Sequence, residues 1–170
     1  MKLADVVVDR PRLLLVGINP GLRSGALGHH FAGNGNPFWR LLAAAKLTPV
    51  LLGYAEDKRL AEFGIALTNL CPRTTRSAAE LTRAEIARGR AALARKIARW
   101  RPTVIGFVGV SLYGMYFGRA SGGGPGAKPE TIAGARVFVV PNPSGLNASY
   151  PGFAHKLVWF RKLRAFLAKS

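Results

Sequence analysis

The sequence of 170 residues predicts an α/β fold, a single-domain three-layer α/β/α sandwich with a mainly parallel central sheet. Nearly continuous apolar runs are typical of strands buried on both faces. Four such runs occur, at residues 13–18, 65–70, 103–109 and 136–143. Segments with helical spacing of apolar residues lie between them. Because strands and helices alternate, we expect parallel strands in one domain that spans residues 1–170.

Two of the helical segments have clear start signals. Asn36 is the expected N-cap of one helix, with Pro37 in its first turn. Thr82 and Glu85 have capping-box spacing, and the helix that they begin should end before Pro102.

The C-terminal third combines one helix with one irregular segment. A final helix is expected at about 153–168, with apolar residues among basic ones. The segment 118–130 is rich in glycine and proline, which predicts a surface loop before the last strand.

The charge is strongly unbalanced, with 25 lysines and arginines against 8 acids and a formal net charge of +17. Such an excess favours a polyanionic partner, because binding phosphates releases condensed counterions. An arginine-rich genome or attraction to anionic membranes are alternatives, but neither explains the scarcity of acids. We therefore favour nucleic acid. The longest apolar stretch is short and broken by glycines, which predicts a soluble, intracellular protein with no membrane partner.

Cysteine and histidine usage argues against a metal centre. Cys71 is the only cysteine, so an intramolecular disulfide and a four-cysteine cluster are excluded, and we expect a small buried side chain. His29, His30 and His155 have no metal-ligand spacing. Loop hydrogen bonding or phosphate contact is the expected role of the adjacent pair His29–His30.

The stretch "GINPG" at residues 17–21 directly follows an apolar strand, and "PNPSGLNAS" at 141–149 follows the last one. Ligands of parallel sheets gather beyond the carboxyl ends of the strands, so these two loops are the candidate site. Neither loop contains an acid. The acids lie in a predicted surface segment, at helix starts or elsewhere: Glu56, Asp57 and Glu62; Glu80 and Glu85; Asp5, Asp9 and Glu130. Without a carboxylate pair, any chemistry must use largely neutral groups.

An asparagine amide is a poor base, but it can orient a water molecule by accepting one hydrogen bond and donating others. This suffices where the leaving group departs early, as in hydrolysis of an N-glycosidic bond to uracil or thymine. The base then leaves as an anion, which backbone N–H groups can stabilise. Asn19 is the candidate. Leu146, in the second loop, fits either a packed staple or a wedge between base pairs, and its spacing leaves both open.

Three segments resemble the mismatch-specific uracil/thymine-DNA glycosylases. "GINPGLRSGALGHHFAGNGNPFW" is similar to the first motif of that family, including its "GHH-aromatic" and "GN-x-FW" portions. "ALTNLCPRTTRSAAELTRAEIARGR" is similar to the middle segment, and "VPNPSGLNAS" to the bacterial form of the second motif. The resemblance runs from about residue 12 to the C-terminal helix and implies a uracil-DNA-glycosylase-like fold.

The resemblance implies a role for each matched residue. Asn19 would position the attacking water, and Phe31 would stack on the extruded base. Backbone groups of Ile18 and Phe31 would read the pyrimidine edge. Ser24 would lie near the pyrimidine C5 edge, and Asn69 could hydrogen-bond the base. "GHH" and "TN" resemble the thymine-processing branch of the family, whereas "NPSGLN" resembles its bacterial uracil branch. Ser24 favours uracil first, with thymine and modified cytosines left open.

In the second motif, Leu146 would be the inserted wedge, and Gly145 and Asn147 would contact the orphaned guanine. Reading that guanine would explain a preference for mismatches.

The implied activity is that of a monofunctional DNA glycosylase that flips out uracil opposite guanine in double-stranded DNA and begins base excision repair. No metal or cofactor is implied, and the matched motifs have no lysine at a Schiff-base position. Two alternatives stay open: a broad uracil-DNA glycosylase that also acts on A:U pairs or single strands, and a non-catalytic basic nucleic-acid-binding domain. We expect a monomer in the bacterial cytoplasm, associated with the nucleoid through DNA.

Overall fold

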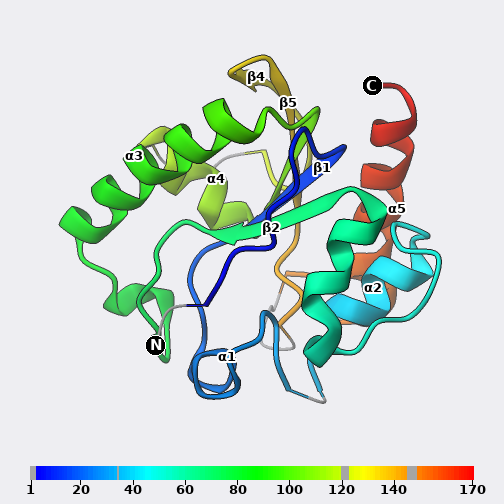
Figure 1. Cartoon of the computed structure of the whole chain (residues 1–170), viewed down its shortest axis with the longest axis horizontal. Helices are drawn as coiled ribbons and strands as arrows, with labels where there is room; N and C mark the ends of the chain where they lie inside the picture. The colour runs from blue at the N-terminus through cyan, green and yellow to red at the C-terminus, as the bar shows by residue number, and fades with distance from the viewer. Residues whose placement is uncertain (1–2, 34, 120–122, 145–148) are drawn as a thin grey trace.

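The computed structural model describes residues 3–33, 35–119, 123–144 and 149–170. Its centre is a five-stranded sheet in the order β2-β1-β3-β5-β4 (Figure 1). Four strands are mutually parallel, as predicted: β1 (Leu13–Gly17), β2 (Ile65–Asn69), β3 (Val104–Val108) and β5 (Ala135–Val140). The α/β fold class is therefore confirmed.

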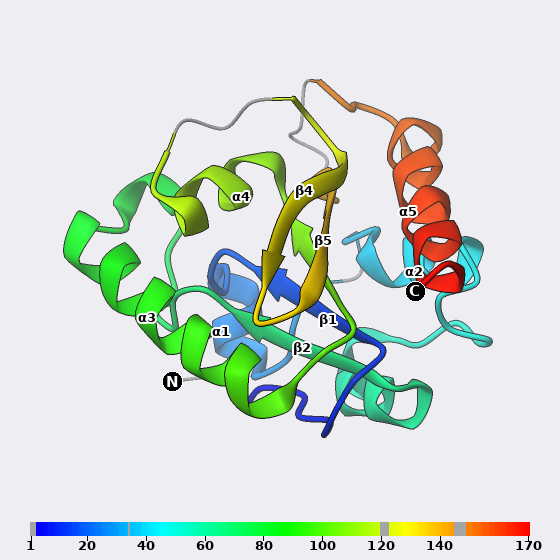
Figure 2. The same ribbon diagram turned by 90° about the horizontal axis from the view of Figure 1, so that it is seen from above.

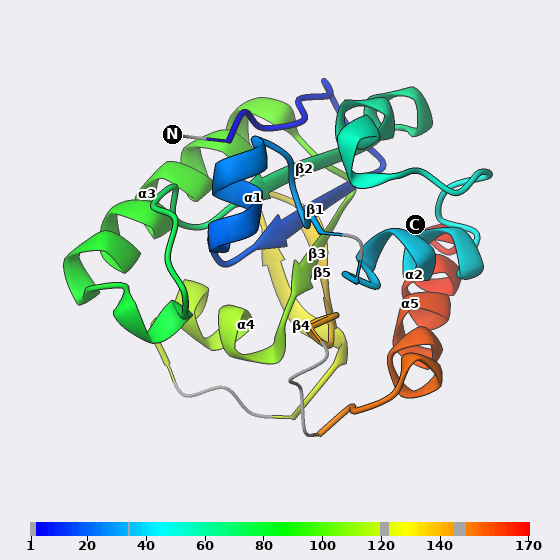
Figure 3. The same ribbon diagram turned by 90° about the horizontal axis from the view of Figure 1, so that it is seen from below.

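Helices cover both faces of this sheet (Figures 2 and 3). One face packs against α2 (Phe38–Ala44), α5 (Phe153–Ala168) and the 3₁₀ helix η1 (Tyr54–Phe63). The other face packs against α3 (Arg83–Trp100) and α4 (Val110–Phe117). Two short elements, α1 (Leu22–Leu27) and the 3₁₀ helix η2 (Ala78–Glu80), lie in the connections after β1 and β2. None of the described helices is long and apolar enough to cross a membrane.

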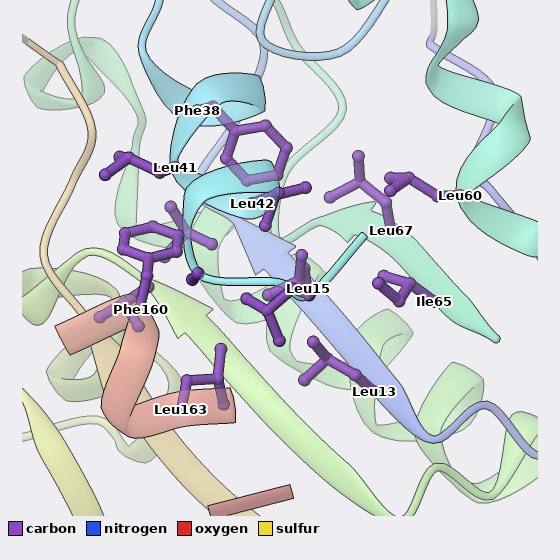
Figure 4. Close-up of a cluster of buried hydrophobic side chains, with 14 of the residues drawn as sticks. Leu13, Leu15, Phe38, Leu41, Leu42, Leu60, Ile65, Leu67, Phe160 and Leu163 are labelled. Carbon is purple, nitrogen blue, oxygen red and sulfur yellow. The ribbon is translucent and has the colours of Figure 1, made fainter. Parts of the chain in front are cut away.

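The apolar runs are continuous because each strand buries side chains on both faces. In β1, Leu13 and Leu15 belong to the core beneath α2 and α5, whereas Leu14 and Val16 belong to the core beneath α3 and α4. Figure 4 shows the first of these cores, in which Phe38 from α2 lies over the sheet. This separation into two cores is the physical basis of the three-layer arrangement.

The helix starts follow their sequence signals closely. Thr82 Oγ1 accepts a hydrogen bond from the Glu85 N–H at 3.1 Å, and the Glu85 carboxylate accepts one from the Thr82 N–H at 2.8 Å. The Asn36 side chain accepts from the Phe38 N–H at 3.0 Å. Pro37 rather than Asn36 is the N-cap of α2, so this prediction was wrong by one residue.

The predicted loop at 118–130 is partly wrong, because β4 (Gly126–Ile132) begins inside it and pairs antiparallel with β5. Exposure alternates along β4, so the strand lacks the apolar run that marks a buried strand. Pro129 lies within a register shift between Lys128 and Thr131, and β4 is the last strand of the sheet. Edge strands and bulges tolerate proline, since no ladder hydrogen bond is needed from that nitrogen.

Candidate active site at the carboxyl ends of the strands

The end of the sheet near α1 gathers the first-motif residues. Gly17 ends β1 and Asn69 ends β2, and the two residues are register partners. Ile18 and Asn19 follow directly. In Figure 1 this edge faces the bottom, where α1 lies, and Figure 3 views the molecule from that side. Three residues of the second motif, Gly145, Leu146 and Asn147, lie outside the described residues.

The Asn19 amide has a defined orientation. Its Nδ2 donates to the carbonyl oxygen of Arg73 at 2.8 Å and to Thr75 Oγ1 at 2.7 Å. A carbonyl oxygen can only accept, so the amide nitrogen must face Arg73. Both amide hydrogens are thereby engaged, and Oδ1 receives no hydrogen bond from any described residue. A partly buried acceptor of this kind can hold one water molecule by a hydrogen atom.

The groups that orient Asn19 are themselves supported. Thr75 Oγ1 donates to the Ser77 carbonyl at 2.8 Å, so it must accept from Asn19. The Arg73 guanidinium contacts the Glu85 carboxylate, with Nε and Oε1 2.6 Å apart. This contact is the largest of the effects that lower the pKa of Glu85 to about 2, and the hydrogen bond from the Thr82 N–H is the next largest. The N-terminal end of α3 therefore supports the loop that orients Asn19.

Gly17 lies between Asn69 and Phe31. An added Cβ at Gly17 would lie 2.6 Å from Asn69 Oδ1 and 3.6 Å from the Phe31 ring. The two side chains therefore converge on the same backbone position, one with a hydrogen-bonding amide and the other with an aromatic ring. A side chain at residue 17 would occupy the space between them, and glycine keeps that space open.

Phe31 is held in an unusual backbone conformation, with φ of +47°. Its ring stacks on Phe38, with ring centroids 3.8 Å apart and planes inclined by 12°. Its carbonyl accepts a hydrogen bond from Trp39 Nε1 at 3.2 Å. Since Phe38 is fully buried, the Phe31 ring is an aromatic platform anchored in the core.

The structure places Ile18 and Ser24 near this platform in supporting positions. The Ile18 carbonyl accepts from the Cys71 N–H at 2.9 Å. Ser24, on α1, is buried, and its hydroxyl accepts from the Ala32 N–H at 3.0 Å. This hydroxyl therefore fixes the chain directly after Phe31. Contact of Ser24 with a pyrimidine C5 edge stays a prediction.

Asp57 does not lie on a surface segment, as was predicted, but is only 3% exposed. Its carboxylate accepts from the His30 N–H at 3.0 Å and lies 3.2 Å from His29 Nδ1. His30 Nε2 lies 2.8 Å from the carbonyl oxygen of Ala4, to which it must donate. The two histidines thus serve loop hydrogen bonding, one of the two expected roles, in the residues that directly precede Phe31.

Sequence reasoning missed Arg73, Thr75 and Asp57 as site residues. All three contact the first motif from elements more than 25 positions away in the chain. Arg73 and Thr75 lie in the quoted middle segment, but nothing in it indicated a contact with Asn19. The signal for Asp57 was that it is one of just eight acids, and that signal does not indicate a buried position.

A hollow and a buried thiol complete the description of this edge of the sheet. A hollow of about 480 Å³ beside Phe31 has Arg23, Asn36 and Ser144 in its lining. Within the described ranges, no group of three or more histidines, cysteines or acids could hold a metal ion. Cys71 is buried, as predicted, and burial raises the pKa of its thiol, which disfavours a nucleophilic role.

The mainly parallel α/β sheet carries, at the carboxyl ends of β1 and β2, an amide of fixed orientation at Asn19 and a core-anchored aromatic ring at Phe31. The chain belongs to the uracil DNA glycosylase superfamily, whose family model matches residues 4–164.

Two similar proteins extend this comparison. A G/U mismatch-specific uracil DNA glycosylase from Schizosaccharomyces pombe is 34% identical over 167 residues, which cover 91% of this chain and 50% of that protein. The chain therefore spans about half the length of this relative. A solution NMR structure from Methanosarcina acetivorans, provisionally described as a uracil DNA glycosylase, has a TM-score of 0.61. At 18% identity it covers 96% of this chain and 97% of its own, and it supports the fold.

Proposed function

We propose that this protein is a monofunctional, mismatch-specific uracil-DNA glycosylase that excises uracil opposite guanine from double-stranded DNA. The observation that carries the proposal is the Asn19 amide, whose two hydrogens are engaged by Arg73 and Thr75 while Oδ1 stays available to a water molecule. Membership of the uracil DNA glycosylase superfamily and the name of the S. pombe relative support the choice of base and mismatch.

In the proposed reaction, an extruded uracil stacks on Phe31, and the N–H groups of Ile18 and Phe31 contact its edge. The bond between uracil N1 and the sugar C1′ breaks first, and its electron pair leaves with the base. The water held by Asn19 then bonds to C1′ and loses a proton to solvent or to the departing anion. Asn19 itself takes no proton, so a neutral amide is sufficient.

Substrate choice is proposed to depend on Ser24 and Asn69. The buried Ser24 hydroxyl fixes the segment that carries Phe31, which would limit the room for a C5 methyl group. Asn69 presents its amide beside Gly17, where it can hydrogen-bond a pyrimidine. We therefore propose uracil as the preferred base, with thymine and modified cytosines as further candidates.

Release of free base from a panel of duplexes tests this proposal. Uracil, thymine and a modified cytosine are placed opposite guanine, with A:U and single-stranded uracil for comparison. We expect single-turnover release to be fastest from G:U, undiminished by EDTA, and to leave an abasic site in an uncut strand. Equal rates on G:U, A:U and single strands would instead support a broad uracil-DNA glycosylase.

Asn19→Ala is the matched variant for this panel. Removing a positioned group of this kind costs roughly 10²–10³-fold in rate. We expect such a loss with DNA affinity unchanged, since no phosphate contact is removed. Release at the normal rate would contradict the assigned role of Asn19.

We propose further that Leu146 fills the space left by the flipped base, with Gly145 and Asn147 at the orphaned guanine. Leu146→Ala should then weaken binding to abasic product while affinity for undamaged duplex is kept. Unaltered product affinity would favour a packing role. The enzyme is proposed to act in the bacterial cytoplasm and as a monomer. Light scattering of the free protein and of the DNA complex can test the monomeric state.

A further inference from the structure

A cationic surface lies at the end of the sheet opposite the candidate active site. It consists of Arg12, Lys46, Arg161 and Arg164, which we call the opposite-edge surface. Two adjoining hollows of about 930 and 480 Å³ lie among these side chains. The larger has Arg12, Lys46 and Arg164 in its lining, and the smaller has Lys46, Arg161 and Arg164. The two hollows therefore share two of the four cations.

The chain topology fixes the position of this surface. Arg12 directly precedes β1, and Thr103, which also lines the larger hollow, directly precedes β3. Both residues thus lie at the amino ends of parallel strands, whereas Gly17 and Asn69 lie at the carboxyl ends. In Figure 1 the C-terminal end of α5 is at the top and α1 is at the bottom.

The opposite-edge surface carries four positive charges. No aspartate or glutamate is among the described residues that line either hollow.

The groove along α3 differs in this respect. Asp5 there lies 2.8 Å from Lys96, and Glu85 lies 2.6 Å from Arg73. Two cations of that groove, Arg73 and Lys96, are thus paired with acids, whereas the opposite-edge cations have no such partners among the described hollow-lining residues.

Arg12 has a fixed position within the opposite-edge surface. Its Nε donates to the Phe63 carbonyl at 2.6 Å, and its Nη2 donates to the Leu47 carbonyl at 2.7 Å, so the guanidinium is held in place. Two effects lower the pKa of Arg12: burial is the larger, and the positive charge of Arg164 is the smaller. An anion seated between Arg12 and Arg164 would relieve this repulsion.

A duplex held at the candidate active site would not reach this surface. Five-residue strands separate the two edges by about 17 Å of sheet, before the loops at each end are added. Because the hollows are open and share cations, they suit a row of phosphates better than a single small anion.

We propose that the opposite-edge surface binds the phosphate backbone of a second DNA segment, so that one protein molecule bridges two duplexes. The polyanion is identified as DNA on the basis of the proposed function, whereas the surface itself is defined by its charges. Contact with a second segment would let the enzyme transfer between DNA segments without full dissociation.

Capture of a second duplex tests this inference. Protein is first bound to an immobilised, non-cleavable G:U-analogue duplex, and a fluorescent undamaged duplex is then added at low salt. The test variant carries Lys46→Gln, Arg161→Gln and Arg164→Gln, and Arg12 is kept because it binds two carbonyls. The matched control carries Arg88→Gln, Arg95→Gln and Arg99→Gln, three exposed charges removed from α3.

We expect the wild type and the α3 variant to capture the second duplex, and the test variant to lose at least fivefold in capture. Each lost phosphate contact lowers the logarithmic salt slope by roughly 0.9, so the slope should fall by about 2 to 3. Equal loss in both variants, no capture by the wild type, or capture only by a protein dimer in light scattering would overturn the inference. Single-turnover base release is measured separately, so a failure of the proposed function is distinguishable.

Discussion

The carbonyl oxygen of Arg73 lies 2.8 Å from Asn19 Nδ2 and accepts its hydrogen bond, although the two residues are 54 positions apart in the chain. Together with Thr75, this contact directs the only acceptor of the Asn19 side chain, Oδ1, away from Arg73 and Thr75. The amide of Asn19 is thus oriented by a loop that belongs to a different strand connection. Variants in that loop should alter the chemistry without touching Asn19.

Thr75→Val removes the acceptor of one Asn19 amide hydrogen and should slow base release about tenfold, the equivalent of one hydrogen bond of roughly 1.4 kcal/mol. Thr74→Val is the matched control. The buried Thr74 hydroxyl has no hydrogen-bond partner among the described residues, so its removal should leave release unchanged and stability equal or higher. Single-turnover rates and thermal unfolding check both variants. Similar rate losses in the two would refute the specific role of Thr75.

Gly17→Ala should reduce activity while the protein stays folded, because the new Cβ would lie 2.6 Å from Asn69 Oδ1 and displace that side chain. Gly35→Ala is a suitable control, since an added Cβ there meets no atom within 4 Å. We expect a loss of at least tenfold in base release for the first variant and no change for the second. The readout is the rate with saturating DNA, supported by circular dichroism. A fully active Gly17→Ala variant would mean that the space between Asn69 and Phe31 is not used.

Asp57→Ala should lower both stability and the rate of base release, because two groups in the loop before Phe31 lose their acceptor. Leaving the buried His30 N–H unpaired costs roughly 1–3 kcal/mol of unfolding free energy. Asp57→Asn keeps one acceptor oxygen and should recover part of the rate, while DNA affinity stays constant in both. Glu62→Ala, at an exposed acid on the same 3₁₀ helix paired with Arg59, is the control and should be nearly neutral. If both Asp57 variants released base at the normal rate, the loop would not depend on this carboxylate.

Glu85 should contribute a pH-dependent stability. Its pKa is lowered from the ordinary 4.5 to about 2, first by Arg73 and then by the Thr82 N–H. A carboxyl group with a lowered pKa contributes its full stabilisation of the fold above pH 4.5, and this contribution disappears as the pH falls towards 2. The melting temperature of the wild type should thus exceed that of Glu85→Gln at pH 6, and the difference should shrink between pH 4.5 and 2.

Glu56→Gln is the matched control for Glu85, because Glu56 also caps a helix start and pairs with an arginine, Arg59. Hydrogen bonds from the Gly53 N–H and from Arg59 lower its pKa too. Both variants should therefore show pH-dependent destabilisation, but only Glu85→Gln should slow base release, since only Glu85 contacts Arg73. A difference in melting temperature that is constant with pH would contradict this account.

Local sequence patterns predicted the parts of the fold that depend on burial and helix capping. The four parallel strands, α3 with its Thr82–Glu85 capping box and the final helix were all expected. The edge strand β4 was missed, because it is held mainly by backbone pairing with β5 and its exposed face has no apolar pattern. The first motif itself could be located, since a polar loop after a buried strand is visible in the sequence.

The sequence by itself determined that the chain forms a mainly parallel α/β sheet and that Asn19 follows its first strand, and the resemblance to a glycosylase family added Phe31 and Asn69 as candidates for the same edge. Apolar periodicity and strand ends are local properties, and they are written in consecutive residues. Only the tertiary structure decided which way the Asn19 amide faces, what holds the segment before Phe31, and that Asp57 is buried there. These features depend on hydrogen bonds between residues 27 to 56 positions apart, whose partners are chosen by how the layers pack.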